Sequence, residues 1–291
     1  MLSSVILSLA ALFLSSPPPE GSLKRQIKKE LAAVKGTFAV AFKDLQTGEE
    51  ILINAKESFH AASTMKTPVM IEVYNQAAAG KFSLSDSIVV HQNFESIADQ
   101  SEFVLGQSSD SDQELYGQTG RKVAIKDLLY RMIIQSSNLA TNLIIELVGA
   151  EKVNQTMRLI GAKDIRVLRG VEDLKAYEKG LNNITTAYDQ LLIYTLLAQG
   201  KIADAADTKA MTAILLDQKF NEIIPAKLPK EVKVAHKTGS ITGVQHDAGI
   251  VYLPDGRKYV LVLLSKDLQD EKAGVEVLAR VSEMIYKGMS K

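Results

Sequence analysis

The chain has 291 residues, of which 46% are hydrophobic, 23% charged and 6% aromatic, a composition typical of a globular protein with a substantial buried core. Its 34 basic residues balance 34 acidic residues, so no overall field attracts nucleic acid or an anionic membrane, and we expect neither as a partner. Cysteine is absent, which excludes disulfides, thiol nucleophiles and iron–sulfur or cysteine-ligated zinc sites. The four histidines form no His-Glu-x-x-His pair, so a zinc helix of the metalloprotease type is unsupported.

The N-terminal segment differs from the rest of the chain. Residues 1–19 carry no charged side chain, and an apolar run from Val5 to Leu14 precedes a Ser-Ser-Pro-Pro-Pro stretch. This run is too short to cross a membrane, which needs about 20 helical residues, but it suits the apolar region of a secretory signal peptide. We therefore expect residues 1–22 to be a signal peptide and the mature protein to be exported to a bacterial periplasm or secreted, without stable membrane insertion. An uncleaved anchor or a buried helix is the alternative.

The next elements are a helix and a hairpin. The apolar spacing predicts a helix over residues 26–34. Residues 36–43 alternate as in a strand, and residues 51–54 form a second strand after the turn at residues 44–48. These two strands are expected to pair as a hairpin.

From residue 63 to about residue 200 the pattern is mostly helical, and no strand pair is predicted. Apolar residues at three-and-four spacing predict helices over residues 69–79, 125–135, 140–148, 151–159 and 186–199. Two segments, 94–122 and 168–184, lack this periodicity and are expected to be long loops. The first is either a functional loop or a solvated insertion, whereas the carboxylates in the second favour a functional loop.

The last part of the chain returns to β structure. Strands are predicted over residues 232–236, 247–253 and 259–265, followed by a helix over residues 273–286. Strands at both ends of the chain with helices between them imply a sheet assembled from segments far apart in the sequence. We therefore predict the α+β class, with an antiparallel β-sheet flanked by helices as an α/β/α sandwich.

An all-helical subdomain is expected to be inserted into this sandwich, with a cleft between the two parts. Residues 23–67 and 208–291 are expected to form the sheet subdomain, and residues 68–207 the helical one. The two subdomains together are expected to make one domain.

The first candidate catalytic motif is Ser63-Thr-Met-Lys66, which opens a segment predicted to be helical. Residues three apart share a helix face, so the hydroxyl and the amine lie close together. A serine hydroxyl becomes reactive when a base removes its proton, and a desolvated lysine has a pKa low enough to be that base. The free N–H groups and dipole of a helix start also stabilise a developing oxyanion. Taken alone, the motif is better explained by an ordinary helix start with an exposed Lys66.

The second motif, Lys237-Thr-Gly-Ser240, is expected to end the strand over residues 232–236. Its glycine permits close approach of the backbone to a ligand, the hydroxyls of Thr238 and Ser240 can bind a carboxylate, and Lys237 supplies positive charge. A plain turn at a strand end is the alternative.

A third polar motif, Gln-Ser-Ser-Asn at residues 135–138, interrupts two predicted helices. Taken alone, it is explained by helix capping at Ser137 or Asn138. In their order and separation, the three motifs together resemble the Ser-x-x-Lys, Ser-Asp-Asn and Lys-Thr-Gly signatures of the class A β-lactamases and penicillin-binding serine enzymes. The resemblance extends over about residues 25–290, nearly the whole chain past the leader.

The resemblance implies a role for each polar residue. Ser63 is the expected acylated nucleophile, and Lys66 is its proton-transfer partner. Ser136 is expected to relay a proton to the lactam nitrogen with help from Lys237, and Asn138 to bind the substrate amide. The remaining substrate-binding candidates are Thr238, Gly239 and Ser240, and the N–H groups of Ser63 and Ser240 are the expected oxyanion hole.

The chain departs from the family pattern in its middle motif and offers two candidates for the deacylating base. Ser137 stands where class A enzymes usually have an aspartate that mainly holds neighbouring structure. In these enzymes a glutamate in an omega-shaped loop activates water, and the corresponding loop here is residues 168–184. The flanking length favours Glu172, whereas the family's Glu-x-x-x-Asn spacing matches Glu178 with Asn182; Glu178 therefore stays open as the alternative base.

Two further positions are compared with the family pattern. His246 stands where the family often has an arginine that binds the substrate carboxylate. A protonated His246 can do the same work, but we favour the alternative that it forms hydrogen bonds within the sheet. Tyr116, in the loop over residues 94–122, is a candidate for lining the cleft, as a tyrosine does in the family.

The activity implied by the resemblance is that of a class A-type serine β-lactamase. It opens the β-lactam ring through a serine acyl-enzyme, which a water activated by a loop glutamate then hydrolyses. The expected partner is a small-molecule β-lactam, no metal or cofactor is implied, and the protein is expected to be a monomer. The alternatives are a related D,D-peptidase or transpeptidase-like hydrolase with slow deacylation, and a non-catalytic sensor domain that is merely acylated.

Overall fold

The computed structural model describes residues 20–289. The predicted signal peptide lies outside the described residues except for its last three positions, which begin helix α1 (Glu20–Leu31). This helix begins and ends earlier than the predicted helix over residues 26–34. Among the described residues, no helix is both long enough and apolar enough to cross a membrane.

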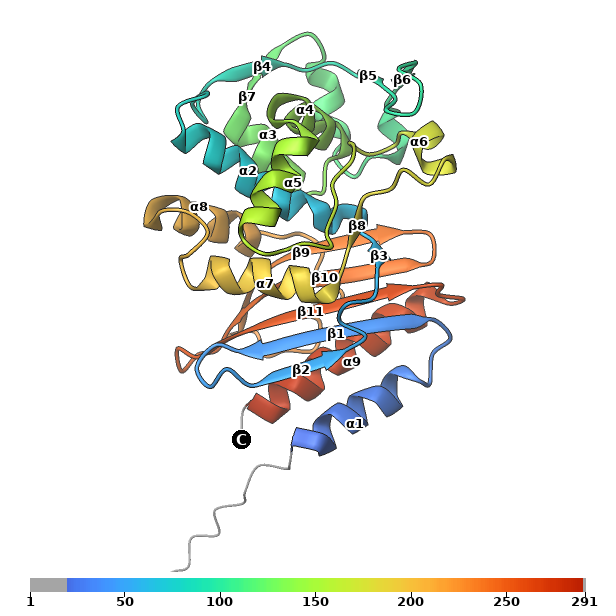
Figure 1. Ribbon diagram of the computed structural model, residues 1–291, viewed down its shortest axis with the longest axis vertical. Helices are drawn as coiled ribbons and strands as arrows, with labels where there is room; N and C mark the ends of the chain where they lie inside the picture. The colour runs from blue at the N-terminus through green and yellow to red at the C-terminus, as the bar shows by residue number, and fades with distance from the viewer. Residues whose placement is uncertain (1–19, 290–291) are drawn as a thin grey trace, which may run out of the picture.

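The central element is a five-stranded sheet in the order β2-β1-β11-β10-β9, in which all neighbouring strands are antiparallel (Figure 1). Its strands are β1 (Thr37–Asp44), β2 (Glu50–Ile53), β9 (Lys233–Ile241), β10 (Val244–Tyr252) and β11 (Lys258–Lys266). The N-terminal β1 pairs with the C-terminal β11 in a register that places Val40 opposite Leu263. The predicted α+β class and the antiparallel sheet built from distant segments are therefore confirmed.

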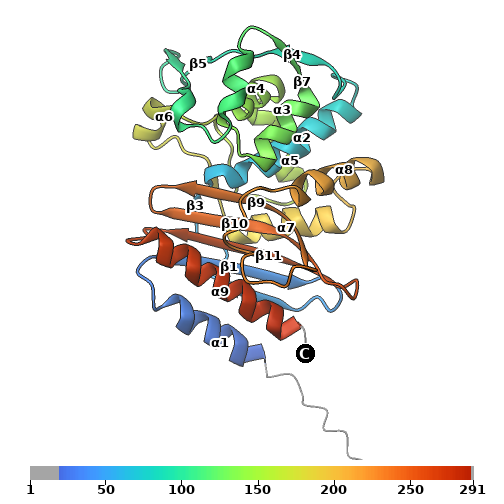
Figure 2. The same ribbon diagram turned by 180° about the vertical axis from the view of Figure 1, so that it is seen from behind.

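Helices cover both faces of this sheet. Helices α1 and α9 (Glu271–Met289) pack on one face, and α7 (Ala187–Ala198) packs on the other, as Figure 2 shows from behind. Side chains of a strand alternate between faces, so Ala39 and Ala41 of β1 join the core on the α7 side, whereas Val40 joins the core with α1 and α9. Because both faces are covered, β11 is buried at every position between its two ends.

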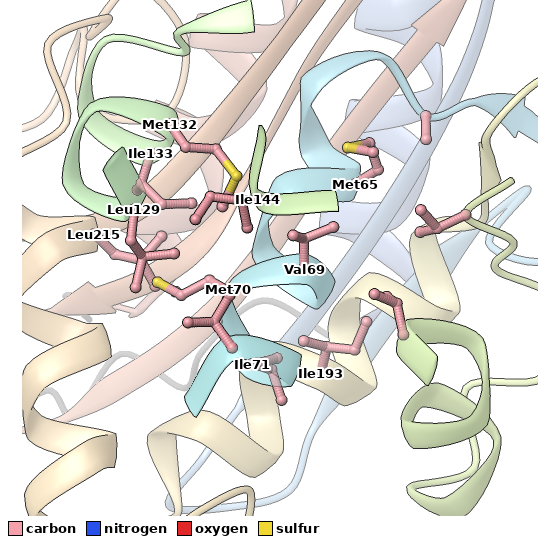
Figure 3. Close-up of a cluster of buried hydrophobic side chains, with 14 of the residues drawn as sticks. Met65, Val69, Met70, Ile71, Leu129, Met132, Ile133, Ile144, Ile193 and Leu215 are labelled. Carbon is pink, nitrogen blue, oxygen red and sulfur yellow. The ribbon is translucent and has the colours of Figure 1, made fainter. Parts of the chain in front are cut away.

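Five more helices pack beside the sheet, and four of them contact the fifth, α2. They are α2 (Lys66–Ala78), α3 (Ile125–Ile134), α4 (Asn138–Val148), α5 (Ala150–Leu159) and α8 (Ala205–Leu216). The first nine residues of α2 are all buried. Figure 3 shows apolar side chains on this helix and around it: Met65, Val69, Met70, Ile71, Leu129, Met132, Ile133, Ile144, Ile193 and Leu215. Tight packing of this kind holds the start of α2 in one position.

Between residues 63 and 200 the structure contains strand pairs that the sequence pattern does not predict. Three two-stranded ladders involve this part of the chain: β3 (Phe59–His60) with β8 (Ile184–Thr185), β4 (Ser87–Val89) with β7 (Lys122–Ala124), and β5 (Asn93–Glu95) with β6 (Glu102–Val104). Strands of two or three residues are too short to show an alternating pattern. Helix α8 was also not predicted, because only Met211 and Leu215 along it are buried and its apolar face is narrow.

Short helical turns occupy the two segments predicted to be loops. The segment over residues 94–122 contains the 3-10 helices η2 (Gln107–Ser109) and η3 (Gln113–Gln118), and the segment over residues 168–184 contains α6 (Leu174–Glu178). The division into two subdomains stays a prediction. Its boundaries after residues 67 and 207 fall inside α2 and α8.

Gly249 of β10 pairs with His236 of β9, at a point where the ladder leaves little room for a side chain. A Cβ atom added at Gly249 would lie 2.5 Å from the His236 Cβ and 2.6 Å from the Ala235 oxygen. Overpacking of this kind costs about 1–3 kcal/mol. We expect Gly249→Ala to lower the free energy of unfolding by that amount, measured by urea denaturation followed by circular dichroism.

Gly117→Ala is the matched control, because a Cβ atom there would meet nothing within 4 Å. Equal losses of unfolding free energy in the two variants would contradict the proposed tightness of the β9–β10 ladder.

Candidate active site

A cavity of about 620 Å³ lies beside β9, the edge strand of the sheet. Ser63 lines it from the 3-10 helix η1 (Ala62–Met65), which runs directly into α2. Ser136 and Asn138 line it at the start of α4, and β9 contributes a third wall. The lining from β9 consists of Thr238, Gly239 and Ser240. The structure therefore brings all three predicted motifs together in one groove.

The backbones of η1 and β9 approach closely at Gly239. A Cβ atom at this position would lie 3.0 Å from the Ser63 nitrogen and 3.1 Å from the Thr64 nitrogen. A side chain here would push β9 and η1 apart by a few tenths of an ångström, so the glycine favours this close approach. The prediction that the strand ends at His236 is wrong, since β9 continues through Ser240 to Ile241. The polar residues interrupt the apolar pattern because this part of the edge strand borders a groove instead of the core.

Lys66 is fully buried, and its ammonium donates three hydrogen bonds. The acceptors are the Ser136 backbone oxygen at 2.7 Å, the Ser136 Oγ at 3.1 Å and the Asn138 Oδ1 at 3.2 Å. Burial lowers the pKa of Lys66 to about 7, against the opposing effect of the Asp110 and Glu172 carboxylates. Lys66 therefore exists in both charged and neutral forms near neutral pH.

Lys237 is also fully buried and reaches the same hydroxyl. Its Nζ donates to the Ser136 Oγ at 3.1 Å and to the Thr238 backbone oxygen at 3.0 Å. Burial and the nearby Lys66 charge lower the pKa of Lys237 well below its ordinary value, and Asp247 acts in the opposite direction. Two buried amines thus converge on the single Ser136 hydroxyl.

The motif over residues 135–138 supplies both a helix cap and polar groups for the groove. Ser137 is the N-cap of α4, and its hydroxyl accepts from the Ala140 N–H at 3.3 Å. Asn138 accepts from Lys66 through Oδ1 and donates through Nδ2 to the Glu172 Oε1 at 3.1 Å. The capping explanation and the groove-lining explanation therefore apply to neighbouring residues.

The two glutamates of the loop over residues 168–184 have different positions. Glu172 contacts Asn138, whereas Glu178 is the last residue of α6, on an exposed part of the loop. The base of the loop is held by Asn142, whose amide accepts from the Val171 N–H at 2.7 Å and donates to the Val171 oxygen at 3.1 Å. This clamp places Glu172, and not Glu178, next to the groove residues.

Three residues of the site have left-handed backbones. Among the described residues, six that are not glycine have positive φ, and these include Ala62 at 42°, Ser136 at 56° and Glu172 at 64°. Such conformations cost about 1–3 kcal/mol each and are found where the surrounding structure holds them for a functional reason. Each of the three lies at a different part of the site. Ala62 directly precedes Ser63, Ser136 accepts hydrogen bonds from Lys66, and Glu172 accepts one from Asn138.

His246 does not offer a cation to the groove. Its Nε2 lies 2.8 Å from the His60 oxygen, and its Nδ1 lies 3.0 Å from the Gln245 oxygen and 3.2 Å from the Ser265 nitrogen. Burial lowers the pKa of His246 to about 4, so the ring is neutral at physiological pH. These contacts match the hydrogen-bonding alternative that we favour for His246, and a neutral ring brings no positive charge to a substrate carboxylate.

Several groove residues have no sequence motif that marks them. Gln245 donates to the Ser240 Oγ at 2.9 Å and to the Glu271 Oε2 at 3.2 Å, which joins β9 to the start of α9. Tyr116 was a candidate for lining the groove, but it is 6% exposed and its hydroxyl donates to Asp110 instead.

No group of three or more His, Cys, Asp or Glu side chains in residues 20–289 is arranged to hold a metal ion.

Solved structures of similar fold include β-lactamases. A β-lactamase from Sphaerobacter thermophilus DSM 20745 superposes with a TM-score of 0.80 at 29% identity, covering 93% of this chain and 98% of that chain. A mutant of PBP-A, in an acyl-enzyme complex with penicillin G, superposes with a TM-score of 0.80 at 25% identity, covering 95% of this chain and 99% of that chain.

Sequence comparison gives the same grouping. The extended-spectrum β-lactamase PER-1 from Pseudomonas aeruginosa is 24% identical over 283 residues, which cover 91% of this chain and 86% of that protein. The model of the β-lactamase enzyme family matches residues 22–289. A match of this extent covers every element of the sheet and of the groove, and the chain therefore belongs to the β-lactamase enzyme family.

Proposed function

We propose that this protein is a serine β-lactamase that hydrolyses the β-lactam amide through an acyl-enzyme on Ser63. The observation that carries the proposal is the convergence of Lys66 and Lys237 on the Ser136 hydroxyl, in a groove that Ser63 also lines. Acyl transfer needs a nucleophile, a base, a proton donor for the leaving nitrogen and donors for the oxyanion. The groove offers a candidate for each of these four parts.

Acylation begins when the Ser63 hydroxyl attacks the lactam carbonyl. Neutral Lys66 takes the hydroxyl proton, because a pKa of about 7 leaves a large neutral fraction at physiological pH. The carbonyl oxygen gains negative charge, which the backbone N–H groups of Ser63 and Ser240 stabilise. Gly239 lets β9 come close to η1, since a Cβ atom there would lie 3.0 Å from the Ser63 nitrogen.

Ring opening needs a proton on the lactam nitrogen. Ser136 donates its hydroxyl proton to the nitrogen as the C–N bond breaks, and an adjacent protonated amine restores it. Lys66 and Lys237 both lie at 3.1 Å from the Ser136 Oγ, so either is within direct reach of this hydroxyl. The proton that Lys66 takes from Ser63 can thus be delivered to the leaving nitrogen through Ser136.

Deacylation uses a water molecule activated by Glu172. The carboxylate of Glu172 contacts Asn138, which in turn contacts Lys66, so Glu172 is linked to the groove by hydrogen bonds.

Asn138 binds the substrate amide, and the hydroxyls of Thr238 and Ser240 bind the substrate carboxylate in place of His246. The substrate is a small-molecule β-lactam, and the protein acts as an exported monomer after removal of the leader predicted over residues 1–22.

The nucleophile is tested by Ser63→Ala. We expect this variant to form no covalent adduct with benzylpenicillin in intact-protein mass spectrometry, and its kcat to fall by a factor on the order of 10⁴ or more, because the hydroxyl that forms the acyl bond is missing. Ser87→Ala, in the exposed end of β4, is the control and keeps the adduct. An adduct of unchanged mass on the Ser63→Ala variant would remove Ser63 from the mechanism.

The deacylating base is tested by comparing two single amide substitutions. We expect Glu172→Gln to accumulate the acyl-enzyme and to lower kcat on the order of 10²–10⁴-fold, because the water loses its base. Glu178→Gln changes the same charge on the exposed end of α6 and is expected to turn over normally. Accumulation in the Glu178 variant alone would transfer the role to Glu178. A stoichiometric burst without turnover in the unmodified protein would favour the slowly deacylating alternative.

The pH dependence of acylation reports Lys66. The neutral amine is the active form, so kcat/KM is expected to rise with pH and to level off above an acidic limb near pH 7, where Lys66 loses its proton. The measurement is stopped-flow hydrolysis of a chromogenic cephalosporin between about pH 5 and about pH 9. An acylation rate that stays constant across this range would contradict Lys66 as the base.

A further inference from the structure

Asp110 is a buried carboxylate in the segment over residues 94–122, and it contacts the start of α4. Its side chain is 4% exposed and lies between η2 and η3. It accepts hydrogen bonds from the Asn138 N–H at 3.1 and 2.9 Å, and from the Leu139 N–H at 2.9 Å. The Asp112 N–H and the Tyr116 hydroxyl, both at 3.0 Å, donate to the same carboxylate. A carboxylate with this many donors is held in one orientation.

These contacts complete the N-terminus of α4. The first two free N–H groups of the helix donate to Asp110, and the third, from Ala140, donates to the Ser137 hydroxyl. The N–H of the N-cap Ser137 donates to the Arg131 oxygen at 3.2 Å, and Thr141 makes the first bond within the helix, to the Ser137 oxygen. A negative charge at the positive end of a helix dipole is favourable. The uncharged N-cap Ser137 thus shares the capping of α4 with a carboxylate from another part of the chain.

The same carboxylate acts on the catalytic amine through space. Asp110 and Glu172 raise the pKa of Lys66 against the effect of burial. The charge of Lys66 in turn lowers the pKa of Lys237 on β9, and Asp247 on β10 acts on Lys237 in the opposite direction. Asp110 is therefore one of two carboxylates that set the proton affinity of Lys66.

We propose that Asp110 is a positioning residue of this active site, which fixes residues 136–138 against Lys66 and supplies the fixed negative charge that the middle motif lacks at Ser137. The proposal rests on the proposed function, because it assigns Asp110 to the reaction of Ser63 and Lys66. It also gives the segment over residues 94–122 a functional part, since this segment carries Asp110 to the groove. Asp110 touches neither Ser63 nor the substrate-binding hydroxyls and acts through Asn138 and Lys66.

The test is the Asp110→Asn variant, which keeps the shape of the side chain and removes its charge. We expect kcat/KM for a chromogenic cephalosporin to fall on the order of a hundred-fold, because Asn138 and Ser136 lose their fixed position. Loss of the negative charge lowers the pKa of Lys66, so the acidic limb of the kcat/KM profile is expected to move to lower pH. A cap with a purely structural role would lower stability without moving this limb.

Glu114→Gln is the matched control. Glu114 lies in the same segment, its side chain is 83% exposed, and its substitution removes the same charge. We expect its activity and its pH profile to equal those of the unmodified protein. An acidic limb at the unmodified pH in Asp110→Asn, whatever the change in rate, overturns the proposal.

The double variant Asp110→Asn/Ser137→Asp keeps the test decisive if Asp110→Asn alone does not fold. An aspartate at the N-cap places a carboxylate at the same end of α4, so a folded protein with the acidic limb near its unmodified pH is expected. A folded double variant whose limb stays displaced to lower pH overturns the proposal. Failure of the proposed function is a separate result, because the unmodified protein itself would then show no turnover.

Discussion

Two buried lysines that share one hydroxyl are the constraint on which the rest of the site depends. Lys66 and Lys237 both lie at 3.1 Å from the Ser136 Oγ, and neither side chain reaches solvent. Burial of an ammonium group is unfavourable unless it is hydrogen-bonded or paired with an opposite charge. The carboxylates of Asp110 and Glu172 act on the Lys66 side, and Asp247 acts on the Lys237 side. Burial lowers the pKa of Lys66 and the two carboxylates raise it, and the balance leaves Lys66 able to gain and lose a proton near neutral pH. Acyl transfer needs this property.

The two lysines and the Ser136 hydroxyl must be held in fixed positions, and a different part of the fold holds each of them. The apolar core around α2 fixes Lys66, as Figure 3 shows for Met65 and Val69 on either side of it in the sequence. The five-stranded sheet fixes Lys237 on β9, and the cap of α4 fixes Ser136. The groove therefore forms only where the helices around α2 meet the edge of the sheet. Left-handed backbones at Ala62 and Ser136 are the local cost of this arrangement.

The elements with strong periodicity could be predicted from the sequence. The alternating strand near residue 40 and the long apolar strand near residue 262 were predicted close to their observed bounds, because both strands are buried in the sheet. Helix α8 and the two- and three-residue strands were not predicted, because few of their residues face the core. The extension of β9 through Ser240 also escaped, because strand residues that face a groove are polar.

The site residues that belong to short motifs could be predicted from the sequence. A residue that joins the site from a distant part of the chain could not. The three-residue spacing of Ser63 and Lys66 places them on consecutive turns, and in the structure Ser63 lines the groove while the buried Lys66 contacts the groove residue Ser136. Asp110 meets Asn138 across 28 positions of sequence, and no local pattern marks such a contact. For His246 the family position offered a carboxylate-binding role beside the favoured hydrogen bonds, and its ring nitrogens contact backbone groups. Burial decided its protonation, and burial is a property of the folded chain.

The central claim is that burial, opposed by the carboxylates of Asp110 and Glu172, holds the Lys66 amine near its titration point. The direct measurement is a pH titration of the Lys66 amine by NMR, with labelled lysine and with assignment of its signal by Lys66→Arg. A midpoint near pH 7 is the predicted result, far below the ordinary lysine value of 10.5. A midpoint at the ordinary value would contradict the account, because Lys66 would then stay charged throughout the range in which it is proposed to accept the proton of Ser63.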